Sequence, residues 1–168
     1  DDVIFGCLDT VGPLAGNIAR TAWLVAGYDL VVPGVTVDRQ CGSSQQAVHF
    51  AAQAIMSGTQ DVVIAGGVQT MSKIPIGASM IAGRELGFDH PFHTSPGWLK
   101  RFGDAPVDQF YGASEIAKRW GFSREDLEEF SLNSHRRADK ARDSGWFNKE
   151  ISSINGLEQD ETIRANTS

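Results

Sequence analysis

The chain has 168 residues, of which 41% are hydrophobic, and its formal net charge is −6. This length and apolar content are enough for one buried core. The acidic balance, with no basic cluster longer than Arg136 and Arg137, argues against nucleic acid as a partner. No apolar run approaches the length of a membrane span, and two cysteines do not make a disulfide framework. We therefore expect a protein of the reducing cytoplasm that binds neither nucleic acid nor membrane.

The first part of the chain alternates short apolar strands with apolar helices. The pattern predicts strands at residues 3–8, 34–38 and 61–65, and helices at residues 16–26 and 42–57. The second helix is apolar almost all round, which is typical of a buried helix. The third strand is apolar without alternation, which is typical of a strand covered on both faces. Strands and helices in this order predict a layered α/β sheet.

The periodicity fails between residues 72 and 110, where Gly and Pro recur. A connection of that length indicates a functional excursion or an interaction surface. Helical pattern returns at residues 114–120. Ser123, with an acid three residues further on, predicts the capped start of a helix that runs to about residue 143 and ends at Gly145. Residues 151–154 are expected to form one more short strand.

Cys41 is the candidate nucleophile. It lies between a predicted strand and a long helix, and therefore on a sharp turn close to a helix N-terminus. The unpaired N–H groups and the helix dipole at such a place stabilise a thiolate and lower the pKa of a cysteine. Small side chains at residues 42–44 leave room for a substrate carbonyl. Asp38 would oppose the thiolate unless Arg39 pairs with it. The alternative is a buried structural cysteine, which is the commoner role of a lone Cys.

Other candidate groups give weaker signals. His49 lies about 12 Å along the helix from Cys41 at 1.5 Å per residue, so it is expected to be a hydrogen-bonded core residue and not a base for the thiol. His90 and His93 form an isolated His-x-x-His pair, and structural zinc usually needs four N or S ligands, so no metal is expected. Cys7, in an apolar strand, is expected to be structural.

Three blocks of the sequence resemble the thiolases, the acyl-CoA C-acyltransferases. Residues 37–55 resemble the active-site segment of that family, in which a Cys precedes a Gln-Ala-rich helix. Residues 61–72 are similar to a thiolase strand that ends in Gly-Gly-x-Glu-x-Met-Ser. Residues 111–138 resemble helices of the thiolase loop domain. The blocks occur in the family's order across nearly the whole chain.

The sequence differs from the thiolase pattern at three positions, and the resemblance also implies a division into domains. Asp38, Ser44 and Gln69 stand where most members have Asn, Gly and Glu, and these variants look like an actinobacterial subgroup that includes enzymes shortening sterol side chains. The resemblance implies an α/β thiolase-like layered fold. Residues 1–71 would be an incomplete N-terminal βαβαβ half with a buried active-site helix. Residues 72–168 would be part of the α-rich loop domain that forms the tetramer and the substrate lid. By the same comparison, the first strand and helix and the whole C-terminal domain are absent.

The resemblance also implies an acyltransferase. Cys41 would take an acyl group from a 3-ketoacyl-CoA, or from acetyl-CoA in the reverse direction, and its backbone N–H would be an oxyanion donor. Phe110 and Tyr111 match the loop-domain pair that lines the acyl pocket, although plain hydrophobic packing explains them equally well. Coenzyme A is then a substrate, no cofactor is expected, and the complete protein is a homotetramer. The family's catalytic His, second Cys and Asn lie beyond residue 168, so the chain alone should not turn over.

Two other functions remain open from the sequence. A ketoacyl-synthase-type condensing enzyme also places a Cys before a helix, although the block at residues 66–72 and the loop-domain helices favour a thiolase. A non-catalytic thiolase-like subunit, acting in lipid binding or as a scaffold, would be indicated by a parent protein that lacks the second Cys and the His.

Overall fold

The computed structural model describes residues 1–92 and 95–164. The chain divides into two compact units, Asp1–Asp104 and Ala105–Ser168, and each is described by itself. The expected domain boundary at residue 71 stays a prediction. Within the described ranges, no helix combines the length and the apolar character needed to cross a membrane.

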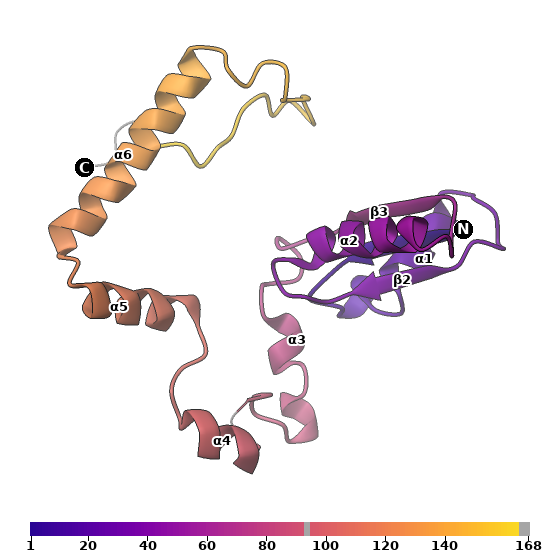
Figure 1. Cartoon of the computed structure of the whole chain (residues 1–168), viewed down its shortest axis with the longest axis horizontal. Helices are drawn as coiled ribbons and strands as arrows, with labels where there is room; N and C mark the ends of the chain where they lie inside the picture. The colour runs from indigo at the N-terminus through magenta and orange to yellow at the C-terminus, as the bar shows by residue number, and fades with distance from the viewer. Residues whose placement is uncertain (93–94, 165–168) are drawn as a thin grey trace. The chain divides into compact units, whose positions relative to one another are not determined.

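The first unit is built on a parallel three-stranded sheet with the order β2–β1–β3 (Figure 1). Its strands are β1 (Asp2–Gly6), β2 (Gly34–Val37) and β3 (Val63–Gly67). The chain passes from β1 to β2 at one edge and then crosses to β3 at the other edge. Because such crossovers are right-handed, the two connecting helices lie on opposite faces of the sheet. The predicted layered α/β sheet is confirmed.

The two connecting helices are α1 (Ile18–Val25) and α2 (Ser43–Met56), close to their predicted bounds. Helix α1 packs on β1 and β2, and α2 packs mainly on β1 and β3. A short 3-10 helix, η1 (Gly12–Leu14), precedes α1. The buried side chains of Cys7, Leu14 and Ile74 form a small core cluster beside it.

Burial around α2 is one-sided. The face against the sheet is buried and consists of Ser43, Gln46, Ala47 and Ala51. Four large apolar residues of the helix are nevertheless exposed: Val48, Phe50, Ile55 and Met56. The prediction of a helix buried all round is thus confirmed only for the face on the sheet, because the described chain provides a packing partner for that face only.

The strand β3 is also less covered than predicted. Ile64 lies beside Val3, which lies beside Gly34, and the Gly34 backbone contacts α1. Ile64 therefore faces the α1 side of the sheet, yet its side chain is substantially exposed. The prediction of a strand covered on both faces is wrong for this residue, because α1 packs on β1 and β2 and β3 forms the other edge of the sheet.

The segment after β3 holds three short helices where no regular structure was predicted. They are α3 (Ala78–Ile81), η2 (Arg84–Leu86) and α4 (Pro96–Phe102). Ser95 caps α4 by accepting a hydrogen bond from the Trp98 N–H, and Pro96 occupies the first helical position. Both are ordinary start signals, which the high Gly and Pro content of the segment concealed.

The second unit contains α5 (Gln109–Trp120) and α6 (Arg124–Asp143). Helix α5 begins five residues before its predicted start because Asp108 caps it, accepting from the Tyr111 N–H at 2.7 Å. The capping box at the start of α6 is confirmed. The Ser123 hydroxyl accepts from the Asp126 N–H at 3.1 Å, and the Asp126 carboxylate accepts from the Ser123 N–H at 2.8 Å.

The strand predicted at residues 151–154 is wrong. The structure forms a single antiparallel bridge there, between Ile154 and Leu157. Asn155 and Gly156 connect them with φ angles of 52° and 81°. Two consecutive residues with positive φ are typical of the tight Asn-Gly turn, so the chain reverses after one bridge and no longer ladder forms.

Removal of the cap should weaken α6. Ser123→Ala deletes the acceptor for the Asp126 N–H, and we expect the free energy of unfolding to fall by about 1 kcal/mol. Thermal unfolding followed by far-UV circular dichroism measures this loss. Ser131→Ala is the matched control, because the Ser131 hydroxyl donates to the Leu127 carbonyl within the same helix. That variant should change stability by less than about 0.5 kcal/mol, and equal losses in the two variants would contradict the prediction.

Candidate active site

Cys41 lies on the turn between β2 and α2, as predicted. It is exposed and directly precedes Gly42, the N-cap residue of α2. Gln40 has a φ of 48°, in the left-handed region that non-glycine residues seldom adopt. The chain therefore reverses sharply within residues 38–42. This geometry puts the thiol beside the positive end of the α2 dipole. The role of Cys41 as a nucleophile stays a prediction.

Ser43 closes the turn. Its hydroxyl donates to the Gln40 carbonyl and accepts from the Arg39 N–H at 2.9 Å. The Arg39 guanidinium donates to the Gln46 side-chain oxygen, and the Asp38 carboxylate accepts from the Gln40 N–H at 2.8 Å. Arg39, the local partner considered for Asp38, thus binds a different group. Ser43 is buried, and its hydroxyl holds the turn through these two hydrogen bonds.

Two glycines let the start of α2 sit directly on the sheet. Gly6 of β1 pairs with Gly67 of β3. A Cβ on Gly6 would lie 2.3 Å from the Ser44 backbone nitrogen, and a Cβ on Gly67 would lie 2.1 Å from the Ser44 hydroxyl oxygen. Neither position has space for a side chain. The turn that carries Cys41 is therefore held against the carboxyl ends of β1 and β3.

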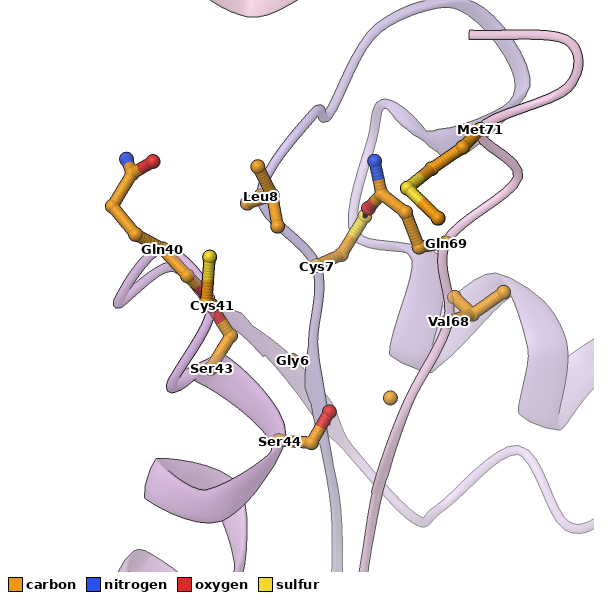
Figure 2. A pocket seen from close by; sticks show the side chains of 11 residues that line it. Gly6, Cys7, Leu8, Gln40, Cys41, Ser43, Ser44, Val68, Gln69 and Met71 are labelled. Carbon is orange, nitrogen blue, oxygen red and sulfur yellow. Dashed lines mark hydrogen bonds between the residues drawn. The ribbon is translucent and has the colours of Figure 1, made fainter. Parts of the chain in front are cut away.

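A pocket of about 320 Å³ lies at those strand ends (Figure 2). Its wall consists of residues 6–8, residues 67–69 and Met71, together with the turn around Cys41. In open parallel sheets, ligands bind outside the carboxyl ends of the strands, where the chain order reverses. In the order β2–β1–β3 this reversal lies between β1 and β3. The pocket beside Cys41 therefore has the position expected of an active site.

Cys7 lies in the wall of the same pocket. Its side chain is 2% exposed, and its thiol donates to the Gln69 side-chain oxygen at 3.9 Å (Figure 2). Burial is the main cause that raises the pKa of the Cys7 thiol. Cys7 is buried, as expected of a structural cysteine, and a thiolate at this position is disfavoured. The sequence did not indicate that Cys7 and Cys41 share a pocket.

Asp9 is a buried polar residue that the sequence analysis missed. Its side chain is 0% exposed. One carboxylate oxygen accepts from the N–H and the hydroxyl of Ser79, each at 3.0 Å. The other accepts from the Gln69 amide at 3.1 Å and from the Gly77 N–H at 3.2 Å. Burial opposes ionisation, but the hydrogen bonds from Ser79, Gly77 and Gln69 outweigh it and lower the pKa of Asp9. The one feature of the sequence that could have indicated Asp9 is an acidic residue placed just after an apolar strand.

Acid should destabilise the first unit through Asp9. Because folding lowers the pKa of this carboxyl, the unfolded chain binds more protons in acid. The stabilisation is complete above the unfolded pKa of about 3.9 and is lost as the pH falls through the folded value. Asp9→Asn should therefore flatten the fall in unfolding free energy below about pH 5. Urea unfolding at a series of pH values measures this, and parallel curves for the two proteins would contradict it.

Comparison with known proteins decides the family. The model of the thiolase N-terminal domain matches residues 1–168. The chain belongs to the thiolase family. It is 57% identical over 154 residues to a steroid 3-ketoacyl-CoA thiolase of Mycobacterium tuberculosis, a match that covers 92% of this chain and 38% of that protein. It is 38% identical over 176 residues to a 3-ketoacyl-CoA thiolase of Idiomarina loihiensis, covering 99% of this chain and 42% of the relative.

A solved structure shows the same fold. The crystal structure of the Bacillus anthracis acetyl-CoA acetyltransferase matches with a TM-score of 0.64 and 28% sequence identity, covering 100% of this chain and 44% of that one. The predicted thiolase-type α/β fold and the resemblance to steroid-degrading thiolases are thus confirmed. This thiolase chain spans 38% and 42% of the length of the two curated relatives.

Among the residues that the structure describes, no histidine lines the pocket. His49 is exposed, on the face of α2 away from the sheet, so the prediction of a core histidine is wrong. The His90 ring contacts the Phe92 ring, with 5.1 Å between centroids. His93 lies outside the described residues. Across residues 1–92 and 95–164, no three His, Cys, Asp or Glu side chains are grouped as metal ligands.

Phe110 and Tyr111 lie in the first turn of α5. Phe110 is 86% exposed and Tyr111 is 41% exposed, so neither is held in a core of the second unit. Plain hydrophobic packing within the described chain therefore does not account for them. Their role in lining an acyl pocket stays a prediction.

Proposed function

We propose that this chain carries the nucleophile of a thiolase that cleaves 3-ketoacyl-CoA by thiolysis, within a longer polypeptide. The observation that carries the proposal is the exposed Cys41 thiol, placed at the start of α2 and in the wall of a pocket at the strand ends. The 57% identity to a steroid 3-ketoacyl-CoA thiolase supports an acyl group derived from a steroid as the substrate class.

In the proposed reaction, the Cys41 thiolate attacks the 3-keto carbon of the substrate. The bond between carbons 2 and 3 breaks, and the departing carbon takes up a proton to give acetyl-CoA. The shortened acyl group remains on Cys41 as a thioester. The thiol of a second coenzyme A loses its proton, attacks the thioester and releases the shortened acyl-CoA, which restores the thiolate. The Cys41 backbone N–H and the positive end of α2 support the oxyanion in each step.

The proposed reaction also specifies which molecules the protein binds. Acyl-CoA and coenzyme A are substrates, so we propose that the reaction needs no cofactor. The remaining expectations, a homotetramer in the cytoplasm that binds no nucleic acid, belong to the same proposal. They are supported by the family membership and by the acidic net charge of −6.

Intact mass spectrometry tests the nucleophile. The chain is incubated at neutral pH with acetyl-CoA and, separately, with iodoacetamide, and far-UV circular dichroism verifies that it is folded. We expect one adduct, on Cys41, that is lost in Cys41→Ala and retained in Cys7→Ala. Equal modification of Cys7 and Cys41 in a folded sample would argue against activation of the thiol by the start of α2.

A further inference from the structure

The four hydrogen bonds that hold the Asp9 carboxylate all come from neutral groups. The four donors are the Ser79 N–H, the Ser79 hydroxyl, the Gln69 amide and the Gly77 N–H. A carboxylate that is 0% exposed is costly to bury unless its oxygens are satisfied, and four donors meet that requirement. The donors come from residues 60 to 70 positions further along the chain. Asp9 thus joins the end of β1 to the segment that follows β3.

The charge on Asp9 determines how the Gln69 amide is turned. A carboxylate only accepts hydrogen bonds, so Gln69 must present its Nε2 group to Asp9, at 3.1 Å. The Oε1 atom then points the other way and accepts from the Cys7 thiol. Gln69 and Cys7 both line the pocket beside Cys41, and Figure 2 shows the Gln69 oxygen next to the Cys7 sulfur. The Gln69 Oε1 atom is therefore a hydrogen-bond acceptor in the pocket wall, and the hydrogen bond from Gln69 Nε2 to Asp9 fixes its orientation.

We propose that Asp9 is a positioning residue for the Cys41 pocket: it orients the Gln69 amide and anchors the segment after β3 that forms the pocket wall. For its kinetic test the inference rests on the proposed thiolase function. Asp9 does not itself line the pocket, so it acts through Gln69.

The arrangement requires a neutral side chain at position 69. In a Gln69→Glu variant a second carboxylate would replace the amide that now lies 3.1 Å from Asp9. When two carboxylates are in contact, repulsion strongly raises the pKa of one of them. The adjoining Cys7 thiol is acted on by two carboxylates, Asp9 and Asp38. The hydrogen-bond donors that hold Asp9 are all neutral, so none of them would compensate a second carboxylate.

A double-mutant cycle in the full-length protein tests the proposal. In Asp9→Asn one of the two accepting oxygens becomes a donor, which then faces either Gln69 and the Gly77 N–H or the Ser79 N–H, so part of the anchoring is lost in either orientation. Gln69→Glu creates the carboxylate pair. We expect each to lower kcat/KM for thiolysis about 10- to 100-fold, mainly in kcat. The combined Asp9→Asn, Gln69→Glu protein pairs a donor with an acceptor again, and its kcat/KM should return to within about fivefold of wild type.

Val3→Ala is the matched control for lost stability. Val3 is buried on the α1 side of β1, away from the pocket, so this variant should unfold more easily while kcat and KM stay within about twofold. Unchanged kcat and KM in both single variants, or a double variant as impaired as the two singles combined, would overturn the proposal.

A second measurement does not depend on activity. The side-chain amide signal of Gln69 in NMR spectra of the chain is assigned by its loss in Gln69→Glu. Bonded to Asp9, its protons should exchange slowly with water, and in Asp9→Asn they should exchange at least about tenfold faster, with no change in Val3→Ala. Fast exchange in the wild type would overturn the proposal. Full activity of Cys41→Ala would instead overturn the proposed function and leave this measurement to decide the role of Asp9.

Discussion

Cys41→Ala should abolish acyl transfer by the full-length protein, with kcat lowered at least about 10³-fold. The physical reason is that the proposed mechanism passes through an acyl thioester on Cys41, which cannot form without its thiol. Cys7, the other cysteine of the pocket, is buried, and burial raises the pKa of its thiol. It therefore cannot substitute as a nucleophile. The measurement is the rate at which 3-ketoacyl-CoA is consumed in the presence of coenzyme A.

The fold should survive this change, because Cys41 is exposed. Far-UV circular dichroism and the unfolding midpoint of Cys41→Ala should match those of the wild type. Acid quenching during turnover, followed by peptide mass analysis, should find the acyl group on the peptide that contains Cys41, in the wild type and in Cys7→Ala alike. Residual turnover by Cys41→Ala within about tenfold of wild type would refute the assignment of the nucleophile.

Gly6→Ala should be among the most damaging single substitutions in the sheet. The added methyl group would lie 2.3 Å from the Ser44 nitrogen and 2.4 Å from the Ser43 carbonyl carbon. Both are backbone atoms at the start of α2 and cannot rotate away. Relief requires α2 to move off the sheet, so we expect the free energy of unfolding to fall by about 3 kcal/mol or more. The same movement displaces the turn that carries Cys41, and labelling of its thiol should change with it.

Gly112→Ala is the matched control for this substitution. Gly112 lies within α5, its backbone φ is not positive, and a Cβ built on it meets nothing within 4 Å. The variant should raise the free energy of unfolding by about 0.5–1 kcal/mol, because alanine favours the helix over glycine. Urea unfolding measures both proteins. A loss at Gly6 of less than about 1 kcal/mol would show that α2 does not rest on β1 as described.

Local signals in the sequence were sufficient for the elements near Cys41. The apolar runs predicted β2 and α2 within about a residue or two, since strand and helix periods are local properties. The capping box of α6 was predicted to the residue, because Ser123 and Asp126 bond to each other's backbone across one helical turn. The tight turn at Cys41 followed from the same reasoning.

Long-range features could not be predicted in this way. Asp9 bonds to Gln69, Gly77 and Ser79, and no local pattern links residues that lie so far apart in the chain. The exposed face of α2 was missed for a related reason. Its apolar residues show that the face favours burial, but hydrophobicity does not show whether this chain supplies the cover.

The thiols of Cys41 and Cys7 differ in exposure, so their rates of alkylation can be used to follow local opening of the protein. An alkylating reagent reaches Cys41 in the native state, whereas Cys7, at 2% exposure, becomes available only when the end of β1 separates from its neighbours. The labelling rate of Cys7 relative to Cys41 therefore reports how often Cys7 becomes accessible. A time course of peptide labelling can then rank variants by how rarely Cys7, in the wall of the pocket, becomes accessible.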